Sequence, residues 1–339
     1  MAHNLNKLLD NLRPSKLLGS KAGEPDRLSR ASSFAPEIGS RTSRDAVRGY
    51  YIDFGLKTAD PRWPTDWLLP AGQGVWVAPI QWGLGAYERY LADHGERWRE
   101  GAIGCANYLV GGQERDGTLR GGWAHREDMR HTFPLAAPWI SAMAQGEGAS
   151  LLVRAHLETG DERFAESALE AMRPMRITAE RGGVAAELDG GWFPEEYPTV
   201  PPSYVLNGAL FALWGCHEVA KGLGDDNARS LYEEGIETLA ANIGRFDLGY
   251  WSRYDLFPHP VSNVASSAYH LLHIRQLRAT SLIEKRPELT AAASRFEAYA
   301  ANRLASNRAF AHKVSFRLAN PRNAYMAHRL PWLRRPSAA

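Results

Sequence analysis

The feature that most constrains the fold is a turn that recurs at a nearly constant interval. Gly95, Gly160 and Gly224 each follow a stretch with apolar residues at helical spacing, and 65 and then 64 residues separate them. An acidic residue follows each glycine directly, and a second helical stretch begins there. Each repeat is therefore one helical hairpin with a long connection. A single hairpin cannot bury its own apolar face, so the chain predicts hairpins that pack on one another.

The repeats predict a mainly α fold built as an α/α toroid of about four helical hairpins. A fourth pair of helices is expected at about 264–280 and 287–304. Packing four pairs around a common axis closes the apolar faces. The long connections contain Gly, Trp and short alternating runs such as 183–188, which favour small β-hairpins on the rim. Loops of a toroid gather at one end, so we expect functional residues to converge there.

Composition divides the chain into three parts. Residues 1–48 are basic and rich in Ser, Gly and Pro, residues 49–305 carry the repeats, and residues 306–339 hold seven Lys or Arg and no acid. We expect the basic ends to be solvated and partly disordered. The alternative is contact with an anionic glycan or, peripherally, with an acidic membrane surface. Extended segments at 50–54 and 74–79 predict a reduced N-terminal β arm ahead of the toroid.

Several function classes are excluded or disfavoured by composition. A formal net charge of +2 is too small for a nucleic-acid binder as a whole. No stretch of about 18 apolar residues and no signal peptide is visible, which predicts a cytoplasmic location. No GxGxxG follows a strand, no Walker motif is present, and the two cysteines form no metal-binding CxxC. We therefore expect no nicotinamide, no other cofactor and no metal.

Three separated motifs carry the functional signal. PWISAMAQGEGASLLVRAHLETGD begins at Pro138, GGWFPEEYPTVPPSYVLNG begins at Gly190, and YDL, Asn263 and a YH pair follow between Tyr254 and His273. In content and order they resemble the C-terminal domain of the D-glucuronyl C5-epimerases, over about 79–300. That resemblance implies a toroidal enzyme that inverts C5 of D-glucuronic acid in a heparosan- or heparan-sulfate-like glycosaminoglycan, giving L-iduronic acid. It also implies a homodimer.

The chemistry explains why such residues are needed. Inverting C5 takes a base on one face of the sugar, an acid on the other, and a positive or hydrogen-bonding group for the carboxylate as it becomes an enolate. The resemblance places the catalytic set on Glu196, Tyr197, Tyr254 and Tyr269. We assign Glu196 and Tyr269 as the opposed pair, and Tyr197 and Tyr254 as groups that polarise or position the sugar. Burial among Trp, Phe and Pro is expected to raise the carboxyl pKa of Glu196.

A second set of residues is expected to hold the sugar. Asn207 and Asn263 match family positions, Arg253 replaces family arginines that this chain lacks, and Arg275 is a weaker substitute. Other candidates stand at helix starts or in the connections, where they could face the cleft or stack on sugar rings: Gln145, Trp139, His131, Trp192, His270 and His273. Against this, the tryptophans could plug the end of the toroid, and Asn207 could be a helix-interior amide. Gly146 and Gly148 are interpreted as helix-packing positions.

Two alternatives to an epimerase remain open. A uronic-acid polysaccharide lyase would use the same proton abstraction on the same toroid and would add loss of the C4 substituent. A non-catalytic glycan-binding module would keep the cleft without the chemistry. A glycoside hydrolase is disfavoured because Glu195 and Glu196 are adjacent and do not form a pair set across a bond.

Overall fold

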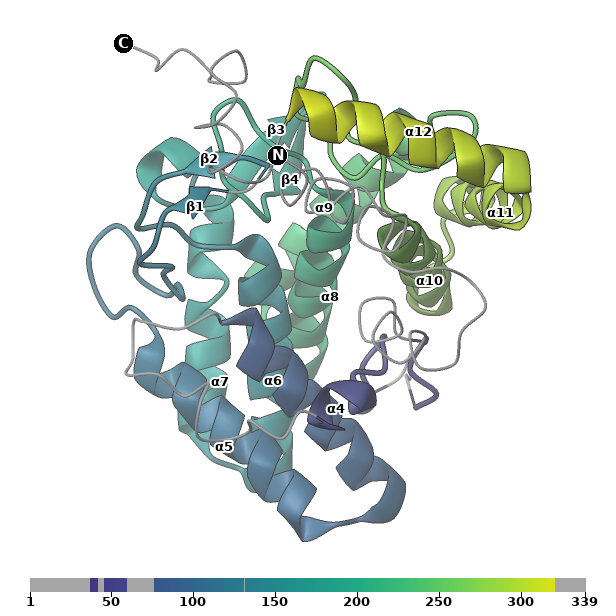
Figure 1. The fold of residues 1–339 in the computed structure, drawn as a ribbon. Helices are drawn as coiled ribbons and strands as arrows, with labels where there is room; N and C mark the ends of the chain where they lie inside the picture. Colours follow the sequence, from purple (N-terminus) through teal and green to yellow (C-terminus); the bar gives the residue numbers. More distant parts are fainter. Residues whose placement is uncertain (1–36, 42–45, 60–75, 131, 321–339) are drawn as a thin grey trace, which may run out of the picture.

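The computed structural model describes residues 37–41, 46–59, 76–130 and 132–320. Its architecture is mainly α, and the four predicted hairpins are confirmed (Figure 1). Their helices are α4 (Val77–Asp93) with α5 (Glu96–Gly112), α6 (Ala142–Thr159) with α7 (Glu162–Glu170), α8 (Leu206–Leu223) with α9 (Asp226–Asn242), and α10 (Ser267–Ile283) with α11 (Pro287–Ala301). A further long helix, α12 (Arg303–Ala319), follows α11.

The first helices of the hairpins form the inner layer of the α/α toroid. α4 packs on α6, α6 on α8, and α8 on α10, in chain order. Nearly every residue of α6 and α8 up to its last turn is buried, as expected for helices covered on all sides. α7, by contrast, buries only Phe164, Ala165, Ser167 and Ala168 and presents its other face to solvent. None of the described helices is long and apolar enough to cross a membrane.

The recurring turns work through capping at both of their ends. α6 and α8 end on glycines in the left-handed conformation, Gly160 at φ 71° and Gly224 at φ 72°. The aspartates that follow them cap the next helices. Asp161 accepts from the backbone N–H of Arg163 at 3.0 Å, and Asp225 accepts from that of Ala228 at 2.7 Å. In the first hairpin His94, and not Gly95, takes the left-handed position.

α6 and α8 approach most closely through glycines. A Cβ on Gly146 would lie 2.5 Å from Ala212 Cα, and one on Gly215 would lie 2.3 Å from Gly146 Cα. A Cβ on Gly148 would meet the ring of Trp123 at 2.6 Å. The interpretation of Gly146 and Gly148 as packing positions is thus confirmed.

Gly146→Ala is therefore expected to destabilise the fold by about 1–3 kcal/mol, because backbone atoms of α8 would have to move. Gly104→Ala is the matched control: it also lies inside a helix, and nothing lies within 4 Å of its Cβ position. The control should raise stability by about 0.5–1 kcal/mol through helix propensity. Urea unfolding of both variants checks this, and equal effects in the two would contradict the packing account.

The connections carry the short strands. β1 (Met129–Arg130) pairs with β2 (Pro134–Leu135), and β3 (Ala185–Leu188) pairs with β4 (Gly191–Pro194), both antiparallel. In the second hairpin Ala185 opposes Pro194 and Leu188 opposes Gly191. The predicted strand at 183–188 starts two residues later than expected. Short 3-10 helices complete the description: η1 (Gly55–Ala59), η2 (Arg173–Arg176), η3 (Ala179–Arg181) and η4 (Ile243–Phe246).

The N-terminal arm, residues 46–59, is packed into the toroid. Tyr50 and Phe54 are buried, and their rings lie 6.5 and 6.0 Å from that of Phe211. Ile52 pairs with Ile38 in an isolated antiparallel bridge. The second extended segment, predicted at 74–79, is wrong for its last three residues, because Val77–Pro79 form the first turn of α4, where proline is tolerated.

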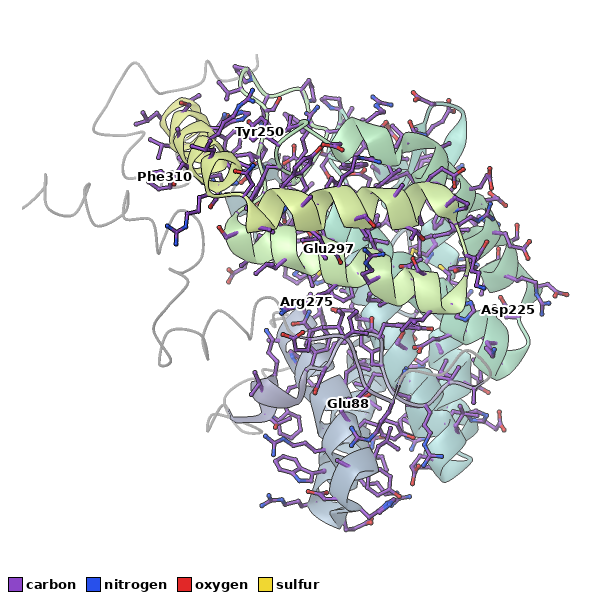
Figure 2. All side chains as sticks on the ribbon, turned by 90° about the vertical axis from the view of Figure 1, so that its right-hand side faces the viewer. Glu88, Asp225, Tyr250, Arg275, Glu297 and Phe310 are labelled. Atoms are coloured by element: carbon purple, nitrogen blue, oxygen red, sulfur yellow. The ribbon has the colours of Figure 1, made fainter. Side chains whose placement is uncertain are left out.

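The predicted boundary at residue 306 falls inside α12. This helix buries Ala305, Ala309 and Phe316, so the basic segment is ordered and packed as far as residue 320. Lys313 is also buried and donates to Asn263 Oδ1 at 2.8 Å and to Val264 O at 2.6 Å. α12 lies over the end of the α10–α11 hairpin, near Tyr250 (Figure 2). The rest of the basic C-terminal tail, for which contact with a glycan or a membrane surface was the alternative, lies outside the described residues.

Candidate active site

A cavity of about 290 Å³ collects residues from all four hairpins and from the arm. Its lining includes Val77 and Gln81 at the start of α4, Ser141 and Met143 at the start of α6, Asn207 and Phe211 at the start of α8, and Tyr269 and Leu272 at the start of α10. The N-terminal ends of the inner helices therefore face this space. The backbone N–H groups there carry partial positive charge, which favours an anionic ligand. Convergence on one rim is what the repeat predicts.

The loop between β4 and α8 brings the two central groups of the site to the cavity. Glu196 and Tyr197 line it together with Tyr269. The Tyr197 hydroxyl donates to Glu196, and the Tyr254 hydroxyl donates to Tyr197. Tyr254 meets Tyr269 edge to face, with ring centroids 4.8 Å apart. The structure thus brings all four predicted catalytic residues into one connected group.

Glu196 is buried, with 4% of its surface exposed. Asn207 Nδ2 donates to its Oε2 at 3.3 Å, and α8 approaches so closely that a Cβ on Gly208 would clash with the carboxylate. Burial raises the pKa of the Glu196 carboxyl to about 7, and the charge of Glu195 acts in the same direction. Near neutral pH this group is therefore populated in both its acid and its base form.

The neighbouring carboxylate, that of Glu195, is hydrogen-bonded to the loop that follows it. Glu195 accepts from the backbone N–H groups of Ser203 and Tyr204, each at 2.8 Å, and from the Ser203 hydroxyl at 2.5 Å. It does not line the cavity. Its hydrogen bonds hold the 195–204 loop in place. Glu195 therefore stabilises the loop, whereas Glu196 faces the cavity.

Burial raises the phenol pKa of Tyr197 and of Tyr254 well above the usual value, and the charge of Glu196 raises both further. Both phenols therefore stay protonated at working pH and serve as hydrogen-bond donors. Trp139 supplies a flat wall to the same cavity, with His125 stacked on it at a centroid distance of 3.9 Å. Burial lowers the pKa of His125 to about 4, so this wall is uncharged.

Several residues expected to contact the sugar are used by the scaffold instead. Gln145 Nε2 donates to Gly121 O and Ala171 O, and its Oε1 accepts from the Trp123 N–H. His270 is fully buried; its Nε2 lies 3.0 Å from Phe296 O, and its Nδ1 accepts from the Ser252 N–H. Both side chains lie at helix starts, as predicted, but neither lines the cavity.

Five further candidates also lie away from the cavity lining. His273 is buried against Ser252, and Trp192 donates to Met175 O at 2.8 Å beneath α9. Asn263 bridges Asp255 and Lys313. Arg253 is half-buried beside Asp255, and Arg275 pairs with Glu37 on the surface. His131 lies outside the described residues.

Two residues in the lining carry no signal from the repeat or from the motifs. Phe54 and Lys57 come from the arm and η1, far from the hairpins in sequence. Gln81 stands at the rim position of the first repeat, and its Nε2 donates to the buried Glu147 of α6 at 3.0 Å. Only the folding of the arm into the ring reveals Lys57 as part of the site.

Comparison with known proteins supports a family assignment. Residues 116–298, slightly more than half of the chain, match the family model described as the D-glucuronyl C5-epimerase C-terminus. A D-glucuronyl C5-epimerase of Caenorhabditis elegans is 34% identical over 214 residues, covering 58% of this chain and 34% of that protein. An uncharacterized protein of Methanocaldococcus jannaschii is 29% identical over 158 residues, covering 45% of this chain and 49% of that one. The chain thus spans a third to a half of the length of these relatives.

Among solved structures, the chain is similar to an unsaturated glucuronyl hydrolase from Bacillus sp. GL1, described as responsible for the degradation of glycosaminoglycan. The TM-score is 0.42 and the sequence identity is 14%, covering 87% of this chain and 83% of that one.

Proposed function

The chain belongs to the family of the D-glucuronyl C5-epimerase C-terminus, and we propose that it inverts C5 of D-glucuronic acid residues in a polysaccharide, giving L-iduronic acid. The observation that carries the proposal is that Glu196 and Tyr269 line one cavity, with Tyr197 and Tyr254 connected to them. A uronate-containing chain such as heparosan is the proposed partner.

The reaction follows from this pair. One of Glu196 and Tyr269 removes the C5 proton, and the electron pair of the C–H bond moves onto the carboxylate to give an enolate. The other group donates a proton to the opposite face of C5. The active pair therefore holds one proton between its two members. Each turnover reverses the protonation states of the two groups. Proton exchange with water then restores the original states.

The remaining residues of the site hold the reacting group and the sugar in position. Of Tyr197 and Tyr254 only Tyr197 lines the cavity. Both stay protonated because their phenol pKa values are raised, so they donate hydrogen bonds that position Glu196 and take no part in the proton transfer. Trp139 provides a surface on which a pyranose ring can stack. Asn207 fixes the Glu196 carboxylate from the start of α8.

The direct test is incubation with heparosan in D₂O followed by NMR of the uronate H5 signal. We expect deuterium to replace H5 and iduronate signals to appear, with the polymer length unchanged. An unsaturated, shortened product would replace the epimerase by a lyase. No exchange on any glucuronate polymer, together with retained binding, would point to a glycan-binding module.

A further inference from the structure

Lys57 is held at the cavity by a well-anchored turn. It lies in η1, directly after the buried part of the arm, and lines the cavity with Phe54. The turn is fixed by the Gly55 N–H, which donates to Asp53 Oδ1 at 2.6 Å, and by the Thr58 hydroxyl, which donates to Gly55 O at 2.6 Å.

The arm can approach α4 this closely because the helix has a glycine, Gly85, at the point of contact. A Cβ on Gly85 would lie 2.3 Å from Phe54 O, so only glycine admits this approach. Arg89 of α4 also donates to Gly55 O, at 3.3 Å. Two positions of α4 therefore set where the backbone of the turn that carries Lys57 lies.

A buried acidic side chain, Glu147, is hydrogen-bonded to Gln81, which lines the cavity. Glu147 of α6 is fully buried, and both of its oxygens accept from Gln81 Nε2, at 3.0 and 3.2 Å. Burial lowers the pKa of Lys57, and the charge of Glu147 opposes that shift. The pKa of Glu147 is raised to about 8 by burial, with Lys57 and Gln81 lowering it and Glu196 raising it.

We propose that Lys57 is the cation that binds the uronate carboxylate at this site, and that Glu147, with Gln81, positions Lys57 for that contact. The identity of the ligand rests on the proposed epimerase function. Among the described residues that line the cavity, Lys57 is the sole Lys or Arg. The arginines that the sequence offered for this task do not line it.

The chemistry needs such a group. When the C5–H electron pair moves onto the carboxylate, a second negative charge develops on its oxygens, and an ammonium placed there stabilises the enolate more than the ground state. Lysine can donate three hydrogen bonds from one point charge, which suits both carboxylate oxygens.

The test measures discrimination, so it does not depend on turnover. A short glucuronate-containing heparosan oligosaccharide and its carboxyl-reduced counterpart, in which glucose replaces glucuronate, are titrated by calorimetry into the full-length wild type and Lys57→Met. The wild type is expected to prefer the carboxylate ligand, and the variant to lose about tenfold to a hundredfold of that preference. Lys57→Arg should restore part of it. Lys57→Gln serves if the Met variant fails to unfold cooperatively.

The matched control is Arg278→Met, which removes a partly exposed cation of α10 that pairs with Glu297 of α11. It should leave the preference unchanged. An unchanged preference in Lys57→Met, or an equal loss in Arg278→Met, overturns the proposal. Failure of the epimerase function gives a different result: no H5 exchange by the wild type, while its carboxylate preference still depends on Lys57.

Glu147→Gln separates positioning from mere structure. Above about pH 8, where the Glu147 carboxyl is ionised, the substitution removes a neighbouring negative charge. The pKa of Lys57 then falls further, so the carboxylate preference should disappear at a lower pH than in the wild type. Glu196, Tyr197, Tyr269 and His125 also face the cavity, and the carboxyl-reduced ligand corrects for their titration. An identical midpoint in both proteins would remove Glu147 from the proposal.

Discussion

Glu196→Gln is expected to lower the rate of H5 exchange and inversion by about a hundred- to ten-thousandfold. The amide keeps the shape of the side chain and can still meet Asn207 and Tyr197, but it can neither take nor give the C5 proton at useful rates. NMR of H5 exchange measures the loss, and circular dichroism verifies the fold. A rate within about tenfold of the wild type would exclude Glu196 as a proton-transfer group.

The neighbouring glutamate gives a matched control. Glu195→Gln makes the same change of carboxylate to amide at a side chain that lies outside the cavity lining. Glu195 accepts hydrogen bonds from the backbone of the 195–204 loop. The substitution should lower stability through lost charge-assisted hydrogen bonds and reduce the rate far less than Glu196→Gln. If both variants lost the same activity, the distinct tasks assigned to the two carboxylates would be contradicted.

The pH dependence has a defined sign. Because the active pair holds one proton, protonating Glu196 while Tyr269 is still a phenol leaves no base. With the pKa of Glu196 raised to about 7, kcat/KM should rise through about pH 7 and fall off with unit slope below it. A profile that stays flat from pH 5 to pH 8, in roughly the range where His and a raised Glu titrate, would show that this carboxyl does not control the reaction.

Arg154→Met is expected to have the largest effect on stability, a loss of roughly 3–5 kcal/mol in the free energy of unfolding. Arg154 of α6 and Glu218 of α8 are both buried, and two hydrogen bonds of 2.5 and 2.7 Å join them. The same guanidinium donates to Arg48 O at 2.8 Å and to Gly49 O at 3.1 Å. Removing the guanidinium leaves a buried, unpaired charge on Glu218 and removes the hydrogen bonds to Arg48 O and Gly49 O that hold the arm.

Urea denaturation measures this loss, and two comparisons interpret it. The double variant Arg154→Met, Glu218→Leu should be more stable than Arg154→Met alone, because no unpaired charge is left in the core. Arg120→Met, which breaks an exposed pair with Glu170, should leave the unfolding midpoint almost unchanged. An Arg154→Met protein as stable as the Arg120→Met protein would refute the anchoring role.

Much of the fold could be predicted because the repeat depends on local conformational preferences, those of helix ends and turns. The left-handed glycines at 160 and 224 and the capping aspartates after them are conformational requirements that a sequence displays directly. The four catalytic candidates could also be found, since they lie in motifs that resemble a known family. Strand and helix ends shifted by two or three residues where no cap marks them.

The rest could not be predicted because it depends on the direction of side chains after folding. Gln145 and His270 stand near the rim as expected, yet backbone groups of the connections take their hydrogen bonds. Lys57 belongs to an arm outside the repeat. Its place in the cavity is decided by the bare surface at Gly85 and by the Arg154 anchor, neither of which a sequence pattern links to residue 57.

The most direct test of the central claim is the position of deuterium after a single turnover in D₂O. If Glu196 and Tyr269 act from opposite faces of C5, the iduronate formed first should carry deuterium at C5, because its proton comes from a group equilibrated with solvent. The glucuronate recovered at the same time should keep protium, which the base returns to the original face. Protium in the newly formed iduronate, carried across by one group, would contradict the account.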